Sequence, residues 1–262
     1  MTLGALVVVL PLLPIGCLVG ADRQALWHVV HDLCVTNQRT SGNPAPCEEV
    51  HLARGEPDDG YAVLKDLLGR TQYLLIPTRR LDGIESPELL AADAPNYWRD
   101  AWVARTYVFR ALGTTLPRDA VGLAINSVSR RSQNQLHIHI DCVRRSVRDT
   151  LIRFRGELGE TWKPFPVPID GQAFLARRVD SPDLDSVDPF RLLAAGDAAA
   201  RRDMAAETLV VVGATFEGPR PGFILLAQSA EPDRDDLGHG EDLLDHDCAV
   251  AKDVAGGAAD KR

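Results

Sequence analysis

Apolar residues recur at helical spacing in some stretches of this chain and form short continuous runs in others, with Pro, Gly and Asn between them. Helices are expected over residues 22–35, 97–112, 148–158 and 189–200, with a short one beginning at Ser86. Strands are expected over residues 61–64, 72–76, 121–125, 136–143, 208–214 and 223–228. The pattern therefore predicts an α+β protein with an antiparallel sheet built largely from hairpins.

The order of a helix followed by a hairpin occurs in residues 22–147 and again in residues 148–250. This repeated order is compatible with an internal duplication. The second copy would then have degenerated, because it has no counterpart of the histidine-bearing strand described below. Residues 251–262 are small and charged, and we expect them to form a disordered tail.

The first 21 residues carry no charged side chain, and residues 3–19 are almost entirely apolar. This length fits the core of a signal peptide and lies at the short edge of a membrane span, which needs about 17–20 apolar residues. Cys17 follows Pro14, Ile15 and Gly16, which is close to a bacterial lipoprotein box except that such boxes carry Leu where Pro14 stands. We predict that residues 1–21 are a signal peptide or a membrane anchor outside the fold.

Composition adds limits to this picture. In 262 residues, 45% are hydrophobic and 25% are charged, which is typical of a globular chain and excludes a disordered or multi-span membrane protein. The net charge of −8 excludes an extended basic surface for nucleic acid. Any phosphate-binding site must therefore be a local cluster of donors.

Four cysteines follow the N-terminal segment: Cys34, Cys47, Cys142 and Cys248. In an exported chain, an even number of cysteines favours disulfide bonds. Four cysteines allow three pairings, and the short loop between Cys34 and Cys47 favours that pair, leaving Cys142 for Cys248. The alternative is four buried thiols, and the spacing matches no metal knuckle.

The chemistry concentrates on the predicted strand over residues 136–143. Alternate side chains of a strand share a face, so His137, His139 and Asp141 should line one side while the apolar residues 136, 138 and 140 enter the core. The preceding loop, residues 126–135, holds two arginines and many amide and hydroxyl donors, which suits a phosphate ligand. The histidine pair has three interpretations: a solvated polar face, a metal site completed by Asp141, or a nucleophilic imidazole.

The spacing Asn126-x6-Gln133-x3-His137-Ile138-His139 resembles the signature of the histidine-triad (HIT) superfamily, in which three histidines alternate with apolar residues. Further blocks resemble the bacterial CDP-diacylglycerol pyrophosphatase family. These blocks include residues 43–49 (NPAPCEE), 72–77 (QYLLIP), 86–90 (SPELL), 132–140 (SQNQLHIHI) and 245–248 (DHDC).

This resemblance implies a HIT-like catalytic domain over residues 22–250, with a curved antiparallel sheet and helices packed on one face. It implies hydrolysis of CDP-diacylglycerol to CMP and phosphatidate through a nucleotidyl-histidine, without a metal or other cofactor. It also implies a bacterial inner-membrane protein with a periplasmic catalytic domain, held by its N-terminal segment.

The resemblance also assigns roles to residues. His139, at the middle position of the motif, would be the nucleophile, and His137 would orient it or contact phosphate. The residues expected to bind substrate are Asn126, Gln133, Asn134, Lys65 and Asp141.

Asp141 is the departure from the superfamily pattern, because it replaces the third histidine. Two alternatives therefore stay open: a HIT-type hydrolase or transferase acting on soluble nucleotides, and a periplasmic nucleotide- or metal-binding protein without turnover. For Asp141 itself, we expect either a contact with Arg130 or Arg131, or a hydrogen bond that orients an imidazole, with His139 favoured.

Overall fold

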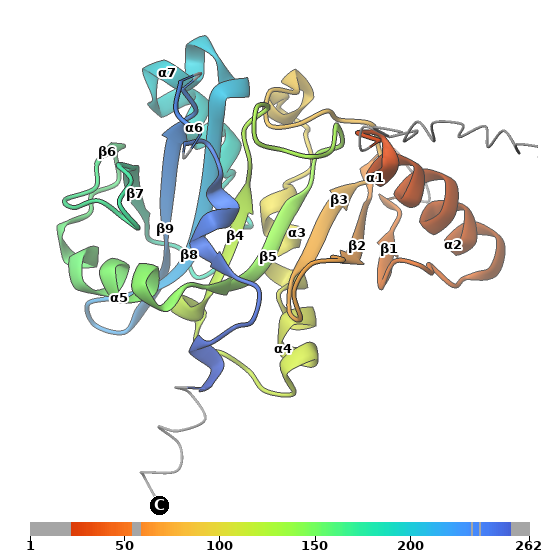
Figure 1. The fold of residues 1–262 in the computed structure, drawn as a ribbon, viewed down its shortest axis with the longest axis horizontal. Coiled ribbons are helices and arrows are strands. Elements are labelled where there is room, and N and C mark those ends of the chain that lie inside the picture. The colour runs from red at the N-terminus through yellow and green to blue at the C-terminus, as the bar shows by residue number, and fades with distance from the viewer. Residues whose placement is uncertain (1–21, 54–58, 232, 236, 253–262) are drawn as a thin grey trace, which may run out of the picture.

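The structure, a computed structural model, describes residues 22–53, 59–231, 233–235 and 237–252. At its centre is an open antiparallel sheet with the order β1-β2-β3-β5-β4-β8-β9-β7-β6, and β10 pairs with β5 (Figure 1). The strands are β1 (Glu49–His51), β2 (Tyr61–Lys65), β3 (Tyr73–Pro77), β4 (Val121–Ile125), β5 (Ile138–Val143), β6 (Lys163–Pro164), β7 (Leu175–Val179), β8 (Glu207–Phe216), β9 (Arg220–Ser229) and β10 (Leu244–Asp245). The α+β class is therefore confirmed.

Helices of several kinds pack around this sheet. The α-helices are α1 (Ala25–His28), α2 (Thr36–Ser41), α3 (Tyr97–Ala104), α4 (Thr106–Leu112), α5 (Arg145–Phe154), α6 (Pro189–Gly196) and α7 (Ala198–Arg202). A π-helical stretch, η1 (Val29–Val35), joins α1 to α2. The 3-10 helices are η4 (Pro87–Leu90), η5 (Arg118–Ala120), η6 (Arg155–Glu157), η7 (Met204–Ala206) and η8 (Gly240–Leu243).

The two predicted hairpins are confirmed by the strand pairing of β2 with β3 and of β8 with β9. The central strand β5 is paired on both sides, with Leu74 of β3 and Ala124 of β4 opposite His139. A strand held on both edges has a fixed register, and register decides which face each side chain occupies. The side chains of β5 are therefore presented rigidly.

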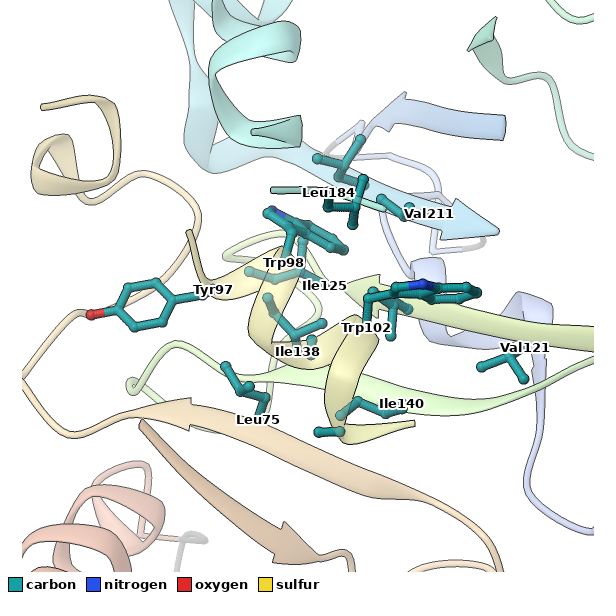
Figure 2. Packing of buried hydrophobic residues seen from close by; sticks show 14 of the residues in the cluster. Leu75, Tyr97, Trp98, Trp102, Val121, Ile125, Ile138, Ile140, Leu184 and Val211 are labelled. Carbon is teal, nitrogen blue, oxygen red and sulfur yellow. The ribbon is translucent and has the colours of Figure 1, made fainter. Parts of the chain in front are cut away.

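One face of the sheet is covered by α3, α4 and α6 around the largest apolar cluster. Figure 2 shows Trp98 and Trp102 of α3 packed over strand residues such as Ile138. Burial of two indole side chains, at 0% and 4% exposure, makes a large contribution to hydrophobic stabilisation. The isoleucines of β5 belong to this cluster, as the alternation predicted.

The opposite face is covered in two separate places. One cluster packs Val30 and Val35 of η1 against Leu74 of β3, and the other packs α5 against β4, β8 and β9. Leu74 and Ala124 flank His139 directly, so these clusters lie on the histidine face on either side of β5. Helices thus cover both faces, and the expectation of helices on one face is wrong because each face carries apolar residues that need covering.

Several helix boundaries also differ from the prediction, including the start of α5 at Arg145 instead of residue 148 and a break at Asp197 within residues 189–200. The first helix does not end before Thr36 but continues to Ser41, because hydroxyl groups such as Thr40 Oγ1 bond back to helical carbonyls and Gly42 then adopts φ 72°. The helix predicted over residues 97–112 is divided at Arg105. The guanidinium of Arg105 binds the Trp102 carbonyl, which in a continuous helix would accept the backbone N–H of Thr106.

Two disulfide bonds join Cys34 to Cys47 and Cys142 to Cys248, as predicted. The first fastens η1 to the loop before β1, and the second fastens β5 to the C-terminal segment. Among the residues described, none of the helices has both the length and the apolar character needed to span a bilayer. The predicted leader, residues 1–21, and residues 253–262 of the predicted tail lie outside the described residues. Residues 251 and 252, predicted to belong to the disordered tail, are helical, because their backbone N–H groups bond to the carbonyls of Cys248 and Ala249.

Candidate active site

A pocket of about 320 Å³ lies on the histidine face of β5. The C-terminal segment with η8 runs across this face, beside β4 and β5 (Figure 1). The pocket is lined by Leu68, Asn126, Arg130, Ser132, His137, His139, Arg144, His239, Glu241, Asp242 and His246. Four imidazoles and two arginines therefore face one space together with two carboxylates, and the imidazoles and arginines are suited to phosphate.

His137 is nearly buried, and its Nδ1 lies 2.7 Å from the backbone carbonyl of Gln135. A carbonyl can only accept, so Nδ1 donates to it and Nε2 carries the lone pair. Burial lowers the pKa of His137, which keeps the ring neutral at neutral pH. The rings of His137 and His139 meet edge to face with centroids 4.9 Å apart, so His137 also fixes the position of its neighbour.

His139 is held by Glu241 and Gln72. Its Nδ1 lies 3.3 Å from Glu241 Oε1 and 2.8 Å from Gln72 Nε2. Gln72 Nε2 also lies 2.8 Å from Asp66 Oδ2 and 2.9 Å from Glu241 Oε1. An amide nitrogen has two protons, and carboxylates are stronger acceptors than imidazole, so we assign the Gln72 protons to Asp66 and Glu241. We therefore assign the ring proton of His139 to Nδ1, where the Glu241 carboxylate at 3.3 Å attracts it, and the lone pair to Nε2.

Nε2 of His139 is buried and has no hydrogen-bond partner within the described part of the chain. Burial lowers the pKa of His139 well below its usual range, despite the nearby Glu241 carboxylate. Burial alone would raise the pKa of Glu241, but the imidazole of His139 and the amides of Gln72 and Asn126 lower it to about 2. At neutral pH the pair is therefore a neutral imidazole beside a carboxylate.

Asn126 fixes Glu241 from the other side. Its Nδ2 donates to Glu241 Oε2 at 3.0 Å, and its Oδ1 accepts the backbone N–H of Glu241 at 3.1 Å. Asn126 ends β4 and Glu241 lies in η8, so this double contact joins the C-terminal segment to the sheet. The carboxylate is thereby fixed before any ligand binds.

Asp141 is completely buried, and it makes no hydrogen bond or ion pair with His139, Arg130 or Arg131. Its carboxylate accepts from Thr71 Oγ1 at 2.6 Å and from the backbone N–H of Cys142 at 2.8 Å, and it lies 3.0 Å from Nδ1 of His246. Arg131 instead pairs with Glu85 at 2.7 Å, and Arg130 pairs with Asp235 at 3.2 Å. Of the two arrangements expected, the structure has the imidazole contact, but the imidazole is His246.

Three other predicted site residues lie outside the pocket lining. Gln133 bonds to the backbone of Asp22 and Leu26, and Asn134 accepts from Arg23, so both hold the start of the described chain. Lys65 donates to the carbonyls of Asp66 and Gly69 in the turn between β2 and β3. Asn126, His137 and His139 are the predicted residues that the fold brings together in the pocket.

Across the residues that the structure describes, there is no group of three or more His, Cys, Asp or Glu side chains arranged to hold a metal ion. The described cluster instead consists of carboxylate–imidazole pairs, with Glu241 3.3 Å from His139 and Asp141 hydrogen-bonded to His246. Each imidazole is thereby oriented by a carboxylate, an arrangement suited to proton transfer and nucleophilic attack.

Comparison with known proteins identifies the family of this chain. The model of the CDP-diacylglycerol pyrophosphatase family matches residues 21–252. The chain belongs to this family. It is 37% identical over 230 residues to the CDP-diacylglycerol pyrophosphatase of Yersinia pestis, covering 88% of this chain and 86% of the relative. The matched region of the CDP-diacylglycerol pyrophosphatase family includes every pocket-lining residue and both disulfides.

Sequence reasoning missed Glu241, His239 and Arg144, and it gave no role to Gln72 or His246. Gln72 and His246 lie in blocks that resemble the CDP-diacylglycerol pyrophosphatase family, so that signal was present without a role attached. Glu241 had no such signal, because it reaches the site only through long-range contacts with β3, β4 and β5.

Proposed function

We propose that this protein hydrolyses the pyrophosphate bond of CDP-diacylglycerol to give CMP and phosphatidate, through a cytidylyl intermediate on Nε2 of His139. The observation that carries this mechanism is the unpartnered lone pair of Nε2, on a neutral ring whose Nδ1 proton faces Glu241. A neutral imidazole attacks without first losing a proton. Glu241 then stabilises the positive charge that develops on the ring.

The reaction divides into two displacements at the same phosphorus. In the first, Nε2 of His139 bonds to the cytidylyl phosphorus and the bond to the bridging oxygen breaks, which releases phosphatidate. In the second, water attacks the phosphorus and the electron pair of the N–P bond returns to His139, which releases CMP. Covalent catalysis of this kind replaces one difficult step by two easier ones.

The pocket also contains groups suited to the phosphates. Arg130 and Arg144 line it and supply positive charge, and His137 presents its own Nε2. Gln133, Asn134 and Lys65 do not line the pocket, so any effect they have on the substrate must act through the segments that they hold. Asn126 acts on the nucleophile through Glu241.

A lipid-linked substrate is supported by the turn between β2 and β3. Leu67 is 100% exposed and Leu68 is 64% exposed, and Leu68 lines the pocket. Lys65 Nζ binds two carbonyls of this turn and Leu68 N donates to Asp66 Oδ1, so the leucines are presented on a fixed loop. An apolar turn at the pocket suits a headgroup that enters while its acyl chains stay outside.

We further propose that residues 22–250 form one HIT-like catalytic domain descended from a duplication. The support is the pairing of hairpins on the two sides of β4 and β5. We place the domain on the periplasmic side of a bacterial inner membrane, with residues 1–21 as signal or anchor. The apolar N-terminal sequence and the two disulfide bonds support this location.

The decisive experiment incubates purified full-length protein with CDP-diacylglycerol and follows release of CMP and phosphatidate. Parallel reactions with soluble CDP-alcohols and with CDP test the alternative of a soluble-nucleotide enzyme. We expect hydrolysis of the lipid substrate and no loss of rate after treatment with a chelator. Tight CMP binding without turnover would contradict the proposal, and chelator-sensitive activity restored by zinc would indicate a metal hydrolase instead.

The Cys142–Cys248 bond gives a separate prediction, because it holds the segment that carries Glu241 and His246. Its sequence separation is 106 residues, for which chain entropy predicts a loss of about 4–5 kcal/mol of stability when the bond is removed. The double variant C142S/C248S should therefore melt at a lower temperature and lose activity well below its melting point. The matched variant C34S/C47S, whose bond spans 13 residues, should lose about 3 kcal/mol and keep its activity when folded. Equal activity of the two variants at a temperature where both are folded would contradict this role.

A further inference from the structure

Asp141 and His246 form a buried pair that the two displacements above do not use. The Asp141 carboxylate is 0% exposed and already accepts from Thr71 and the backbone of Cys142. An ionised carboxylate only accepts, so the third contact, at 3.0 Å, is a proton donated by Nδ1 of His246. The nitrogen of His246 that is left to exchange protons is Nε2.

Nε2 of His246 faces Glu241, the carboxylate beside His139. It lies 3.6 Å from Glu241 Oε1, beyond hydrogen-bond distance, and the same oxygen lies 3.3 Å from Nδ1 of His139. The side chain of His246 is 33% exposed and lines the pocket, so substrate can reach it. The two imidazoles therefore stand on either side of one carboxylate.

The backbone around His246 is fixed as well. Its carbonyl accepts the backbone N–H of Arg70 at 2.9 Å and lies 3.2 Å from the Thr71 hydroxyl oxygen, whose proton goes to Asp141. Two residues later, Cys248 is bonded to Cys142, which directly follows Asp141 in β5. His246 is thus held against β5 by its side chain, its carbonyl and a covalent bond.

Acidic groups on three elements face His246. They are Asp141 of β5, Glu241 of η8 and Asp66 of the turn between β2 and β3. The hydrogen bond to Asp141 raises the pKa of His246, and the charges of Asp141, Glu241 and Asp66 act in the same direction against the effect of burial. The neighbouring imidazole of His139 is neutral, so it does not oppose this protonation. His246 therefore carries a proton at a pH where His139 does not.

We propose that His246, held by Asp141, is the acid that protonates the departing phosphatidate. This inference rests on the proposed attack by His139. As the bond from phosphorus to the bridging oxygen breaks, that oxygen takes the electron pair and the proton from His246 Nε2. In the second displacement His246 takes a proton from the attacking water, which restores the starting state. Asp141 is a positioning residue in this scheme, because it acts through His246.

The test compares His246→Asn with the wild-type full-length protein on a series of aryl esters of CMP. Asn keeps an amide N–H near the position of Nδ1, and so keeps the bond to Asp141, but it has no proton to transfer. Phenyl, para-nitrophenyl and dinitrophenyl esters need progressively less help from an acid. We expect kcat/KM of the variant to fall about 10²–10⁴-fold on the phenyl ester and no more than about threefold on the dinitrophenyl ester. Normal turnover of the dinitrophenyl ester also shows that the variant is folded.

The matched control is His28→Asn, since His28 also faces an aspartate, Asp32, at 2.8 Å but is exposed on α1. It should behave as wild type on every ester. An equal loss on all esters, or no loss on any, would overturn the role of His246. If instead the proposed function itself is wrong, the wild-type protein will form no cytidylyl intermediate on His139, and this result is distinguishable from the loss of the His246 role.

Asp141→Asn tests the positioning role through pH. Activity that needs protonated His246 is lost as pH rises through the pKa of that residue. Because Asp141 raises this pKa, the Asn variant should lose activity at a lower pH than wild type, while retaining activity at more acidic pH. A rate that falls by the same factor at every pH would overturn the positioning role and indicate structural damage alone.

Discussion

Replacement of His139 by Ala is expected to lower kcat by at least about 10⁴-fold, because it removes the atom that bonds to the cytidylyl phosphorus. Groups that bind the phosphates, such as Arg130 and Arg144, would remain and would still bind substrate, so KM should change much less than kcat. The measurement is CMP release, together with trapping of labelled cytidylyl-enzyme by an alkaline quench. Labelling should be absent from His139→Ala.

Two comparisons make this experiment specific. His137→Ala removes a ring that contacts His139 edge to face, so it should lower turnover but leave residual labelling. His28→Ala changes an exposed histidine outside the pocket and should have no effect on either measurement. Full activity or normal labelling in His139→Ala would exclude the proposed nucleophile.

Replacement of Glu241 by Gln should lower kcat about 10²–10⁴-fold with a smaller change in KM. In the tautomer assigned above, the Glu241 carboxylate attracts the Nδ1 proton of His139 from 3.3 Å and the lone pair stays on Nε2, which is the atom proposed to attack. An amide in its place can donate to Nδ1, which favours the tautomer with the proton on Nε2 and removes the charge that stabilises the imidazolium. The substitution is close to isosteric, but one of the two amides that donate to the carboxylate, Gln72 or Asn126, loses its acceptor, so the melting temperature should fall by a small amount.

The readouts for Glu241→Gln are the rate of formation of the cytidylyl-enzyme and the melting temperature. Glu217→Gln, in the exposed turn between β8 and β9, is the matched control and should match wild type in both. If Glu241→Gln forms the intermediate at the normal rate, then Gln72 alone is sufficient to orient His139, and the tautomer assignment is wrong.

The parts predicted correctly from the sequence depend on local periodicity. Alternation on β5 placed His137 and His139 on one face, and turn residues located both hairpins. The helix boundaries at Ser41 and Arg105 were missed because they are set by side-chain bonds to backbone carbonyls, which spacing does not report. The hydrophobic pattern therefore located the helices and strands more accurately than it located the residues at which they end.

Only the part of the site that lies on β5 and the loop before it could be predicted from the sequence, because periodicity is a local signal. The nucleophilic half of the site lies within one strand, whereas Glu241 and His246 come from a segment about 100 residues further along the chain. No periodic signal links such distant positions, and only their contacts in the folded sheet show that they act together. The same limit explains Gln133 and Asn134, whose donors bind Arg23, Asp22 and Leu26 instead of facing the pocket.

The covalent link between β5 and the C-terminal segment has a consequence for where in the cell the protein becomes active. Cys142 and Cys248 stand next to Asp141 and two residues after His246, so the acid pair is closed by the same bond. A newly made chain in a reducing cytosol would carry His139 but would lack the bond that holds Glu241 and His246 opposite it. In the periplasmic location proposed above, oxidation after export would form this bond and complete the site, so the chain would become active only once it had left the cytosol.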